Sequence, residues 1–460
     1  MTQIRRVAVI DIGKTNAKVA LVDLDTLSEI ALRKMPNRPL AHGPYPHHDV
    51  EALWVFILDS LRELGREHRI DAISVTTHGA TAVLLDADGG LAIPVLDYEH
   101  DGPDAVRRDY DAVRPPFDET GSPPLPLGLN LGAQLYWQAR TFPEAFSRVA
   151  SILMYPQYWA WRLCGVTAGE VTSLGCHTDL WSPARTDYST LVDHLGWRGL
   201  FPPIRPAQDR LGPIHPAVAE RTGLDPETPV FCGIHDSNAS LLPHLLSRAA
   251  PFSVVSTGTW VVCMAVGTQS VPLDPARDTL INVNAFGDPV PSARFMGGRE
   301  FELLAQGASS GFTDADVRAV VSQRIALLPA VQQGSGPFPA HEPRWTGRAP
   351  TLEERAVAIS FYLALMTATC LDLVGAQGET IVEGAFAGNE PYVAMLAAAT
   401  GRTVYAQAGR STGTSIGAAL LAAGSEIRKT DGHEVSPVVP DEALRDYADA
   451  WRAAIAAWRV

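Results

Sequence analysis

The sequence lacks the cysteine pairs that disulfide scaffolds and zinc knuckles need. Its five cysteines are scattered, and no two of them show C-x-x-C spacing: Cys164, Cys176, Cys232, Cys263 and Cys370. This spacing argues against both kinds of structure. Unpaired cysteines are typical of a reducing compartment, so we expect a cytoplasmic protein.

Clusters of basic residues are also missing. The formal net charge is −14, and no long run of Lys or Arg occurs. Because proteins meet the phosphates of nucleic acids with clustered Lys and Arg, we expect no nucleic-acid partner. A local basic pocket remains compatible with this charge.

No apolar run has the length and flanks of a membrane span or a signal peptide. Asp11 and Lys14 interrupt the apolar start of the chain, so we expect no secretory signal there. The longest uncharged apolar segment, 356–371, is too short to cross a bilayer comfortably. It follows a predicted capping box from Thr351 to Glu354, and we interpret it as a buried core helix without a membrane partner.

The length of the chain predicts two domains. At 460 residues, with 46% hydrophobic and 19% charged residues, the composition is that of a globular protein that exceeds one hydrophobic core. We place the boundary near residues 245–250, which gives domains 1–246 and 247–460. The oligomeric state stays open, with a homodimer as one alternative.

Hydrophobic periodicity gives a coarse sequence of elements. A hairpin over 5–23 is followed by strands over 29–35, 72–76, 82–86, 380–383 and 403–406, and by a second hairpin over 251–266. Helices are expected over 53–67, 133–140, 151–163, 353–374, 391–399 and 413–423, with an amphipathic closing helix from residue 441. The proline-rich segment 114–126 is expected to be a stiff loop.

The first hairpin, RRVAVIDIGKTNAKVALVD, contains Gly13-Lys14-Thr15, the residues with which a P-loop ends. A P-loop also needs a glycine five residues before Gly13 and a helix after the threonine. Position 8 is Ala8, and residues 17–22 alternate as a strand does. The P-loop interpretation therefore fails, and a strand, an Asp-x-Gly turn and a second strand remain.

A second turn of the same kind, at residues 256–259, begins the second half of the chain. Gly258 allows a close approach of the backbone, as Gly13 does in the first turn. Thr259 offers a hydroxyl. Two such turns could hold the β- and γ-phosphates of a nucleotide with backbone N–H groups. Asp11 would then need a cation such as Mg²⁺ between itself and the phosphates. When either turn is taken alone, a tight hairpin without a ligand is the favoured interpretation, because glycine and small polar residues dominate hairpin turns.

A lone carboxylate, Asp236, follows an apolar approach and Gly233 just before the expected domain boundary. Phosphoryl transfer needs a carboxylate that accepts the proton of the attacking hydroxyl, and Asp236 suits that role. The alternative is that Asp236 caps a helix that begins at about Ala239.

In this order, five segments resemble the FGGY carbohydrate kinases. They are the Asp-x-Gly hairpin of 11–18, 78–81, 233–236, the turn 256–259 and the helix 417–422, and the resemblance covers residues 5 to 425. It implies an α/β fold class with two actin-like (ribonuclease H-like) domains: a sugar-binding domain, a nucleotide-binding domain, and ATP in the cleft between them. It also implies the activity of a phosphotransferase that uses ATP and Mg²⁺.

Transferred residue by residue, the resemblance implies the following roles. Asp236 matches the catalytic base. Asp11 and Asp236 match the carboxylates that are associated with magnesium. The nucleotide-binding positions are Gly13, Lys14, Thr15, Lys18, Gly258, Thr259, Gly384, Phe386 and Asn389. The sugar contacts are His78, Gly79, Tyr98, Glu99, Asp101, His235 and Asp236, with the register of 97–102 open by one residue.

The adenosine loop departs from the family's pattern. The chain reads Gly384-Ala385-Phe386-Ala387-Gly388 where a run of glycines is usual, and has Ala394 where the following helix usually carries an amide. Phe386 could stack on the adenine or belong to the core. A weakened, sugar-binding regulator is therefore one alternative to an active kinase, and an actin-like ATPase that acts on protein partners is another.

The pair His235-Asp236 with the small polar stretch 237–240 resembles the rhamnulose kinase branch more than the glycerol kinase branch. This suggests a deoxyketohexose or its aldose as substrate, with L-rhamnulose, L-rhamnose and L-fuculose as candidates. A deoxy sugar presents a methyl group, so its pocket needs an apolar wall beside its hydroxyl-binding residues.

Overall fold

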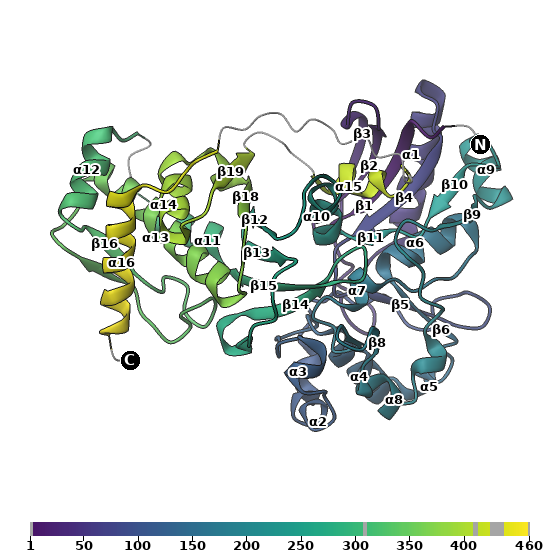
Figure 1. The fold of residues 1–460 in the computed structure, drawn as a ribbon. Coiled ribbons are helices and arrows are strands. Elements are labelled where there is room, and N and C mark those ends of the chain that lie inside the picture. Colours follow the sequence, from purple (N-terminus) through teal and green to yellow (C-terminus); the bar gives the residue numbers. More distant parts are fainter. Residues whose placement is uncertain (1–2, 307–310, 408–412, 424–436, 459–460) are drawn as a thin grey trace. The chain divides into compact units, whose positions relative to one another are not determined.

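The computed structural model describes residues 3–306, 311–407, 413–423 and 437–458. The chain forms two compact units (Figure 1). The first comprises Met1–Ser247, Ile281–Pro289 and Thr412–Thr430, and the second comprises Arg248–Leu280, Val290–Ser411 and Asp431–Val460. Because neither unit is continuous in sequence, the contiguous domain ranges 1–246 and 247–460 stay a prediction.

The first unit is built on a mixed sheet. Its strand order is β3 (Ser28–Pro36), β2 (Asn16–Asp23), β1 (Arg6–Ile12), β4 (Ala72–Thr77), β10 (Pro229–Phe231) and β9 (Arg210–Pro213), and β11 (Ile234–His235) also pairs with β4. Strands β1, β2 and β3 are antiparallel neighbours, whereas β4 runs parallel to β1 and to β10. Because β1, β4 and β11 run parallel, the sheet brings the carboxyl ends of these three strands together.

Side chains of β1 alternate between two cores because successive residues of a strand point to opposite faces. Ala8, Ile10 and Ile12 pack with α1 (Val50–Glu67), α6 (Tyr155–Cys164) and α9 (Pro216–Thr222). Val7 and Val9 pack with α10 (Asp236–Ser247) and α15 (Gly413–Leu420). Asp11, the next residue of odd number, therefore lies on the α10 face of the sheet.

The rest of the first unit forms a separate hydrophobic cluster around the pair β5 (Ala82–Leu85) and β6 (Ser151–Met154). The expected helix 151–163 is thus wrong in its first four residues, where buried Ile152 and Leu153 extend a strand. The segment 114–126 is not wholly a loop, since it contains one short helix, α3. Further elements are η1 (Gly102–Val106), α2 (Arg107–Asp111), α3 (Phe117–Thr120), α4 (Leu131–Thr141), α5 (Pro143–Phe146), α7 (Val171–Leu174), β7 (Trp181–Ser182), β8 (Asp187–Tyr188), α8 (Thr190–His194) and η2 (Arg198–Leu200).

The sheet of the second unit repeats the pattern of the first. Within this unit its strand order is β15 (Pro289–Phe295), β13 (Val261–Val266), β12 (Phe252–Thr257), β18 (Glu379–Gly384) and β19 (Val404–Gln407). Most of β14 (Thr279–Val283) falls in the segment Ile281–Pro289 of the first unit. Strand β12 is antiparallel to β13 and parallel to β18, as β1 is antiparallel to β2 and parallel to β4. Each unit thus begins with a hairpin whose turn lies beside the end of a parallel strand.

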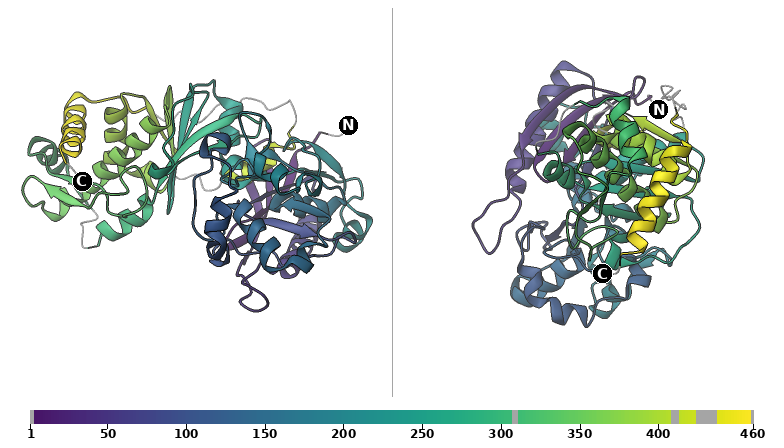
Figure 2. Two further views of the ribbon diagram at one scale, coloured as in Figure 1. Left: turned by 90° about the horizontal axis from the view of Figure 1, so that it is seen from below. Right: turned by 90° about the vertical axis from the view of Figure 1, so that its left-hand side faces the viewer.

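Two helices, α13 (Leu352–Leu373) and α14 (Glu390–Thr400), cover one face of this second sheet, and α16 (Glu442–Ala456) packs on α14 (Figures 1 and 2). The predicted capping box is present, since the Thr351 hydroxyl accepts from Glu354 N and the Glu354 carboxylate accepts from Thr351 N. Among the described helices, α13 alone is long and apolar enough to cross a membrane, and 78% of its most apolar stretch is buried. It is the core helix that the sequence predicts. The remaining elements are η3 (Pro275–Arg277), α11 (Gly297–Leu304), α12 (Asp314–Ser322), β16 (Ala326–Leu328), β17 (Arg344–Thr346) and η4 (Ala385–Gly388).

Candidate active site

The predicted residues fall into two groups, one in each unit. We call the group around Asp11, the turn 13–16, His78, residues 97–99 and Asp236 the first half-site. The group around the turn 257–259 and residues 384–391 is the second half-site. Each is described within its own unit.

The turn of the first half-site is held by a residue that the sequence analysis missed. Gly13 N donates to Asn16 O at 2.9 Å and closes the hairpin. Asn37 donates its side-chain amide to Gly13 O at 2.8 Å and its backbone N–H to Thr15 O at 2.9 Å. Because β2 and not a helix follows the turn, the rejection of a P-loop is confirmed. The Thr15 side chain is left exposed at the tip.

Asp11 and Lys18 face each other across the β1–β2 hairpin. Lys18 Nζ lies 3.2 Å from Asp11 Oδ2 and 3.6 Å from Glu29 Oε1, so this lysine is ion-paired and not merely solvated. Burial raises the pKa of Asp11 to about 6; the positive charge of Lys18 opposes this shift, and the negative charge of Asp236 adds to it. Asp11 and Asp236 are therefore close enough to repel each other.

Two mutually repelling carboxylates suit a hard divalent cation. No group of three His, Cys, Asp or Glu side chains that could hold a metal ion exists among the described residues. Mg²⁺ usually binds through one or two carboxylates and takes its other ligands from water and phosphate. Asp11 and Asp236 are thus compatible with the predicted role in a magnesium–nucleotide site.

Asp236 is the first residue of α10 and directly follows β11. The helix begins at residue 236, so the alternative of a cap for a helix starting at about Ala239 is wrong. Burial raises the pKa of Asp236, while His78 and the hydrogen bond from Ser237 N to Oδ1 (2.6 Å) oppose the shift. A carboxylate with a raised pKa is a stronger base, which is what proton abstraction from an alcohol requires.

His235 holds the carboxylate of Asp236. Its Nε2 lies 3.1 Å from Asp236 Oδ1, and burial lowers the pKa of this histidine to about 4, so the ring is neutral at pH 7. The imidazole thus lies directly against the carboxylate. His235 is predicted from sequence as a sugar contact, and the structure shows it orienting Asp236.

Lys14 lies at the predicted sugar segment. Its Nζ forms ion pairs with Asp97 and, at 3.2 Å, with Glu99, and lies 4.6 Å from the ring centroid of Tyr98. Tyr98 contacts His78 in turn, at 5.5 Å between ring centroids. Lys14, expected at the nucleotide, therefore joins the turn to the 97–99 segment. Asp97, which the sequence analysis missed, is its principal partner.

Asp101 is not part of this cluster. Its side chain is 83% exposed, and its ion pair is with His100 at 3.5 Å. Residue 101 precedes η1, which turns the chain away after the buried segment 95–98. Asp101 thus lies apart from this cluster, and its role as a sugar contact stays a prediction, with the register of 97–102 open by one residue.

The second half-site is shaped by close backbone contacts. Gly258 N donates to Trp260 O at 2.9 Å, and a Cβ on Gly298 would lie 2.2 Å from Gly258 O, so α11 packs directly on the turn. Gly384 has φ +84°, and a Cβ there would lie 2.1 Å from Thr257 O. These glycines bring three segments together, and Thr259 stays exposed at the turn.

A cavity of about 640 Å³ opens beside these segments, within the second unit. Its lining is mostly apolar, as is typical of sites for the base of a nucleotide. Phe301 and Phe312 line it and are 37% and 40% exposed. The other lining residues are Ala305, Ala356, Ile359, Ser360, Ala385, Gly388, Asn389, Glu390 and Pro391.

Phe386 belongs to the core and not to the cavity wall. It is 5% exposed and contacts Phe301 and Tyr392, with ring centroids 5.8 and 5.3 Å apart. Of the two alternatives for Phe386, the structure favours the core, and Phe301 and Phe312 are the aromatic side chains that line the cavity. Asn389 does line the cavity, but its side chain caps α14 and donates to Ser360 Oγ at 2.9 Å.

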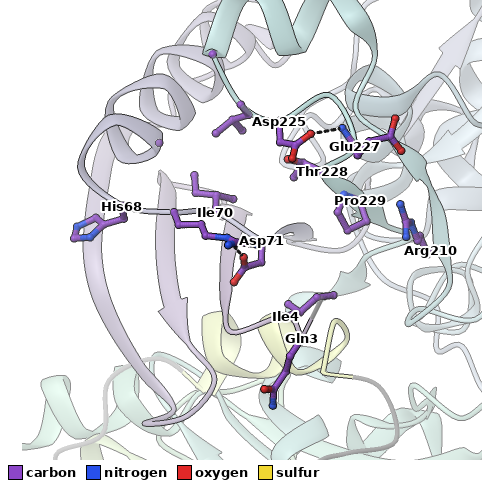
Figure 3. A pocket seen from close by; sticks show the side chains of 14 residues that line it. Gln3, Ile4, His68, Ile70, Asp71, Arg210, Asp225, Glu227, Thr228 and Pro229 are labelled. Atoms are coloured by element: carbon purple, nitrogen blue, oxygen red, sulfur yellow. Dashed lines mark hydrogen bonds and ion pairs between the residues drawn. The ribbon is translucent and has the colours of Figure 1, made fainter. Parts of the chain in front are cut away.

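A second cavity, of about 570 Å³, lies at the amino ends of strands in the first sheet (Figure 3). Ile4, Asp71 and Pro229 line it, at the amino ends of β1, β4 and β10. Asp71 is already satisfied there by Arg69 and by the backbone N–H groups of Arg5 and Arg6. Since the half-site residues lie at the carboxyl ends of these strands, this cavity is separate from them.

Comparison with known proteins agrees with this arrangement of two similar units. The family model "FGGY family of carbohydrate kinases, N-terminal domain" matches residues 120–243, and "Carbohydrate kinase FGGY, C-terminal domain" matches residues 249–430. The crystal structure of a carbohydrate kinase from Novosphingobium aromaticivorans is 38% identical, with 100% of both chains covered and a TM-score of 0.92. The chain therefore belongs to the FGGY family of carbohydrate kinases.

Curated relatives match more distantly. The L-fuculokinase of Escherichia coli (strain K12) is 24% identical over 275 residues, 57% of each chain. The rhamnulokinase of Pectobacterium carotovorum is 27% identical over 213 residues, 44% of this chain and 42% of that one. The match thus spans about half the length of these relatives.

The family and the fold predicted from sequence are confirmed. Both family models and the Novosphingobium structure support the expected class, carbohydrate kinases that use ATP, and two actin-like domains. The roles of individual site residues and the domain ranges stay predictions.

Proposed function

We propose that this protein is an ATP-dependent sugar kinase that transfers the γ-phosphate of ATP to a hydroxyl of a small neutral carbohydrate. The observation that carries the proposal is the first half-site itself. It holds a half-buried carboxylate of raised pKa, Asp236, which lies 3.1 Å from His235 Nε2 and acts electrostatically on Asp11.

In this reaction Asp236 accepts the proton of the attacking hydroxyl. The sugar oxygen forms a bond to the γ-phosphorus, the bond from that phosphorus to the β,γ-bridging oxygen breaks, and ADP leaves. His235 lies against the Asp236 carboxylate, with Nε2 3.1 Å from Oδ1, and limits where the carboxylate can move. When bound, Mg²⁺ would neutralise part of the phosphate charge. Asp11 and Asp236 are the carboxylates that we assign to hold this ion.

The second half-site is our candidate for the adenosine. Phe301 and Phe312 offer exposed ring surface in a cavity of about 640 Å³, and stacking on such rings is a common way to hold a purine. The turn at Gly258 and Thr259 is our candidate for the phosphates in this unit, as Gly13 and Thr15 are in the first.

For the substrate we favour a deoxyketohexose or its aldose. The named relatives are an L-fuculokinase and a rhamnulokinase, and His235-Asp236 stands where the sequence resembles the rhamnulose kinase branch. L-fuculose, L-rhamnulose and L-rhamnose are the candidates. We place the reaction in the cytoplasm, in keeping with five cysteines that form no disulfide.

ADP release, measured with each of these sugars and with several nucleotide donors, tests the proposal. We expect turnover to require both a sugar and ATP. A sugar-binding regulator, the rival that the altered adenosine loop suggests, would bind sugar without releasing ADP. Nucleotide turnover that is indifferent to sugars would instead identify an ATPase that acts on other partners.

A further inference from the structure

His48 is a buried histidine without a hydrogen-bonding partner for either ring nitrogen. Its side chain is 2% exposed, and neither Nδ1 nor Nε2 has a partner. Its backbone N–H donates to Val95 O at 2.8 Å, which fixes the residue just ahead of Asp49, the N-cap of α1. Buried polar atoms are nearly always paired, so two unpaired nitrogens on one ring need an explanation.

A third unpaired nitrogen lies next to it. The His78 ring centroid is 5.3 Å from that of His48, and His78 Nε2 is buried and without a partner. His78 Nδ1 lies 2.9 Å from Gly79 O, and a carbonyl can only accept, so Nδ1 carries the hydrogen. His78 Nε2 is therefore a bare acceptor, which a group with a hydrogen to donate would satisfy.

The two histidines share walls with the candidate sugar site. Tyr155 contacts both rings, at 5.5 Å from His48 and 5.2 Å from His78, and Tyr98 contacts His78. The charges of Asp236, Lys14 and His235 all act on His78, so the cluster lies beside the proposed base. Two tyrosine rings thus pack against polar atoms that no protein group satisfies.

Both imidazoles are neutral at pH 7. Burial lowers the pKa of His48 well below its ordinary value, and the nearby His78 and Lys14 lower it further. Burial also lowers the pKa of His78. The nearby cation Lys14 is already ion-paired with Asp97 and Glu99. The cluster therefore offers hydrogen bonds without a free positive charge.

We propose that His48 is a specificity-determining residue which, with His78, binds adjacent hydroxyl groups of a neutral sugar and disfavours sugar acids. This inference rests on the proposed kinase function. A hydroxyl can donate to His78 Nε2 and still accept from or donate to His48. A carboxylate has no hydrogen to donate, so against the bare Nε2 it would leave both groups unsatisfied.

The test compares His48→Leu and His48→Gln with the wild type in steady-state ADP release. The probes are L-fuculose, L-rhamnulose and D-xylulose as neutral sugars, and D-gluconate as a sugar acid. We expect His48→Leu to raise the KM for the best neutral sugar about tenfold or more, with kcat and the KM for ATP little changed. His48→Gln, which keeps a donor and an acceptor, should recover part of the loss.

Thermal unfolding separates this role from a structural one. Leucine removes two unpaired buried nitrogens, so His48→Leu should keep or raise the Tm of the sugar-free protein. A structural role predicts a lower Tm instead. His194→Leu, a substitution of an exposed histidine in α8 of the same unit, is the control and should change neither KM nor Tm.

Several outcomes would overturn the inference. An unchanged KM in His48→Leu, alongside a working wild-type kinase, would remove His48 from sugar binding and leave the kinase proposal intact. A wild-type preference for D-gluconate over every neutral sugar would also overturn the inference, although the protein would still be a kinase. If none of the sugars supports ADP release, both the inference and the proposed function are overturned.

Discussion

Gly79 lies against the imidazole of His235, so closely that a Cβ on residue 79 would stand 2.8 Å from His235 Nε2. That nitrogen is the one that holds Asp236. The glycine predicted from sequence as a sugar contact is therefore required for another reason: it leaves room for the residue that orients the base.

Gly79→Ala should displace the His235 ring and lower kcat by about tenfold or more, because a misplaced base loses much of its effect. The variant should still fold, since the contacted atom is on a side chain that can move. Steady-state ADP release and thermal unfolding check both points. Gly199→Ala is the control, because a Cβ there meets nothing within 4 Å. Equal kcat values in the two variants would contradict the role assigned to Gly79.

Gly417→Ala should destabilise the first unit. A Cβ at residue 417 of α15 would lie 1.7 Å from Ala239 O of α10, a backbone atom that cannot give way without moving the helix. We expect a loss of about 1–3 kcal/mol or more, seen as a lower Tm, and lower activity because α10 begins with Asp236. At Gly413 of the same helix the nearest atom is 3.6 Å away, so Gly413→Ala should be tolerated. Similar Tm values for both variants would show that the two helices are not tightly packed.

Glu300 should make stability fall as pH rises. Burial raises its pKa to about 7 from an ordinary 4.5, although Gln332 N and the Tyr362 hydroxyl donate to it. Between these two pH values the folded state keeps a proton that the unfolded state has released. Stability therefore decreases from pH 4.5 to 7, and the full cost remains above pH 7.

Glu300→Gln removes that cost and should be more stable than the wild type at pH 8, by on the order of 3 kcal/mol at most. The advantage should shrink towards pH 5. Thermal unfolding across this range measures it. The matched control is Glu302→Gln, an exposed position of the same helix. A constant difference across the whole pH range would mean that Glu300 is already ionised in the folded state.

Phe301→Ala should raise the KM for ATP about tenfold and leave the KM for sugar nearly unchanged, because one stacking surface of the proposed adenine cavity is lost. Leu303→Ala offers the comparison, since Leu303 is also exposed on α11 but does not line the cavity. Kinetics with ATP varied at saturating sugar give the answer. No difference between the two variants would place the adenosine elsewhere.

Hydrophobic periodicity predicted the elements well where it was strong. The hairpins, α1 and α13 were found because their patterns are long and regular. The start of α6 was misjudged because an apolar run of Ser151–Met154 fits a strand and a helix equally well, and only its pairing with β5 decides.

The site was predictable only where a short motif sets it. Asp11, Gly13 and Asp236 stand in short local patterns, which a single sequence is enough to reveal. His48, Asn37 and Asp97 could not be recognised, because they lie far from the motifs in sequence and gain their role through tertiary contact. Phe386 and Phe301 illustrate the same limit: both are aromatic, and only burial shows which one faces the cavity.

The most direct test of the account is to compare turnover and sugar binding in Asp236→Asn. Asparagine keeps the size of the side chain but cannot accept the hydroxyl proton as a base. We predict that kcat falls by about a hundredfold or more, while calorimetric titration shows a sugar Kd close to that of the wild type. Near-normal turnover in Asp236→Asn would contradict the central claim that this carboxylate is the base of a sugar kinase.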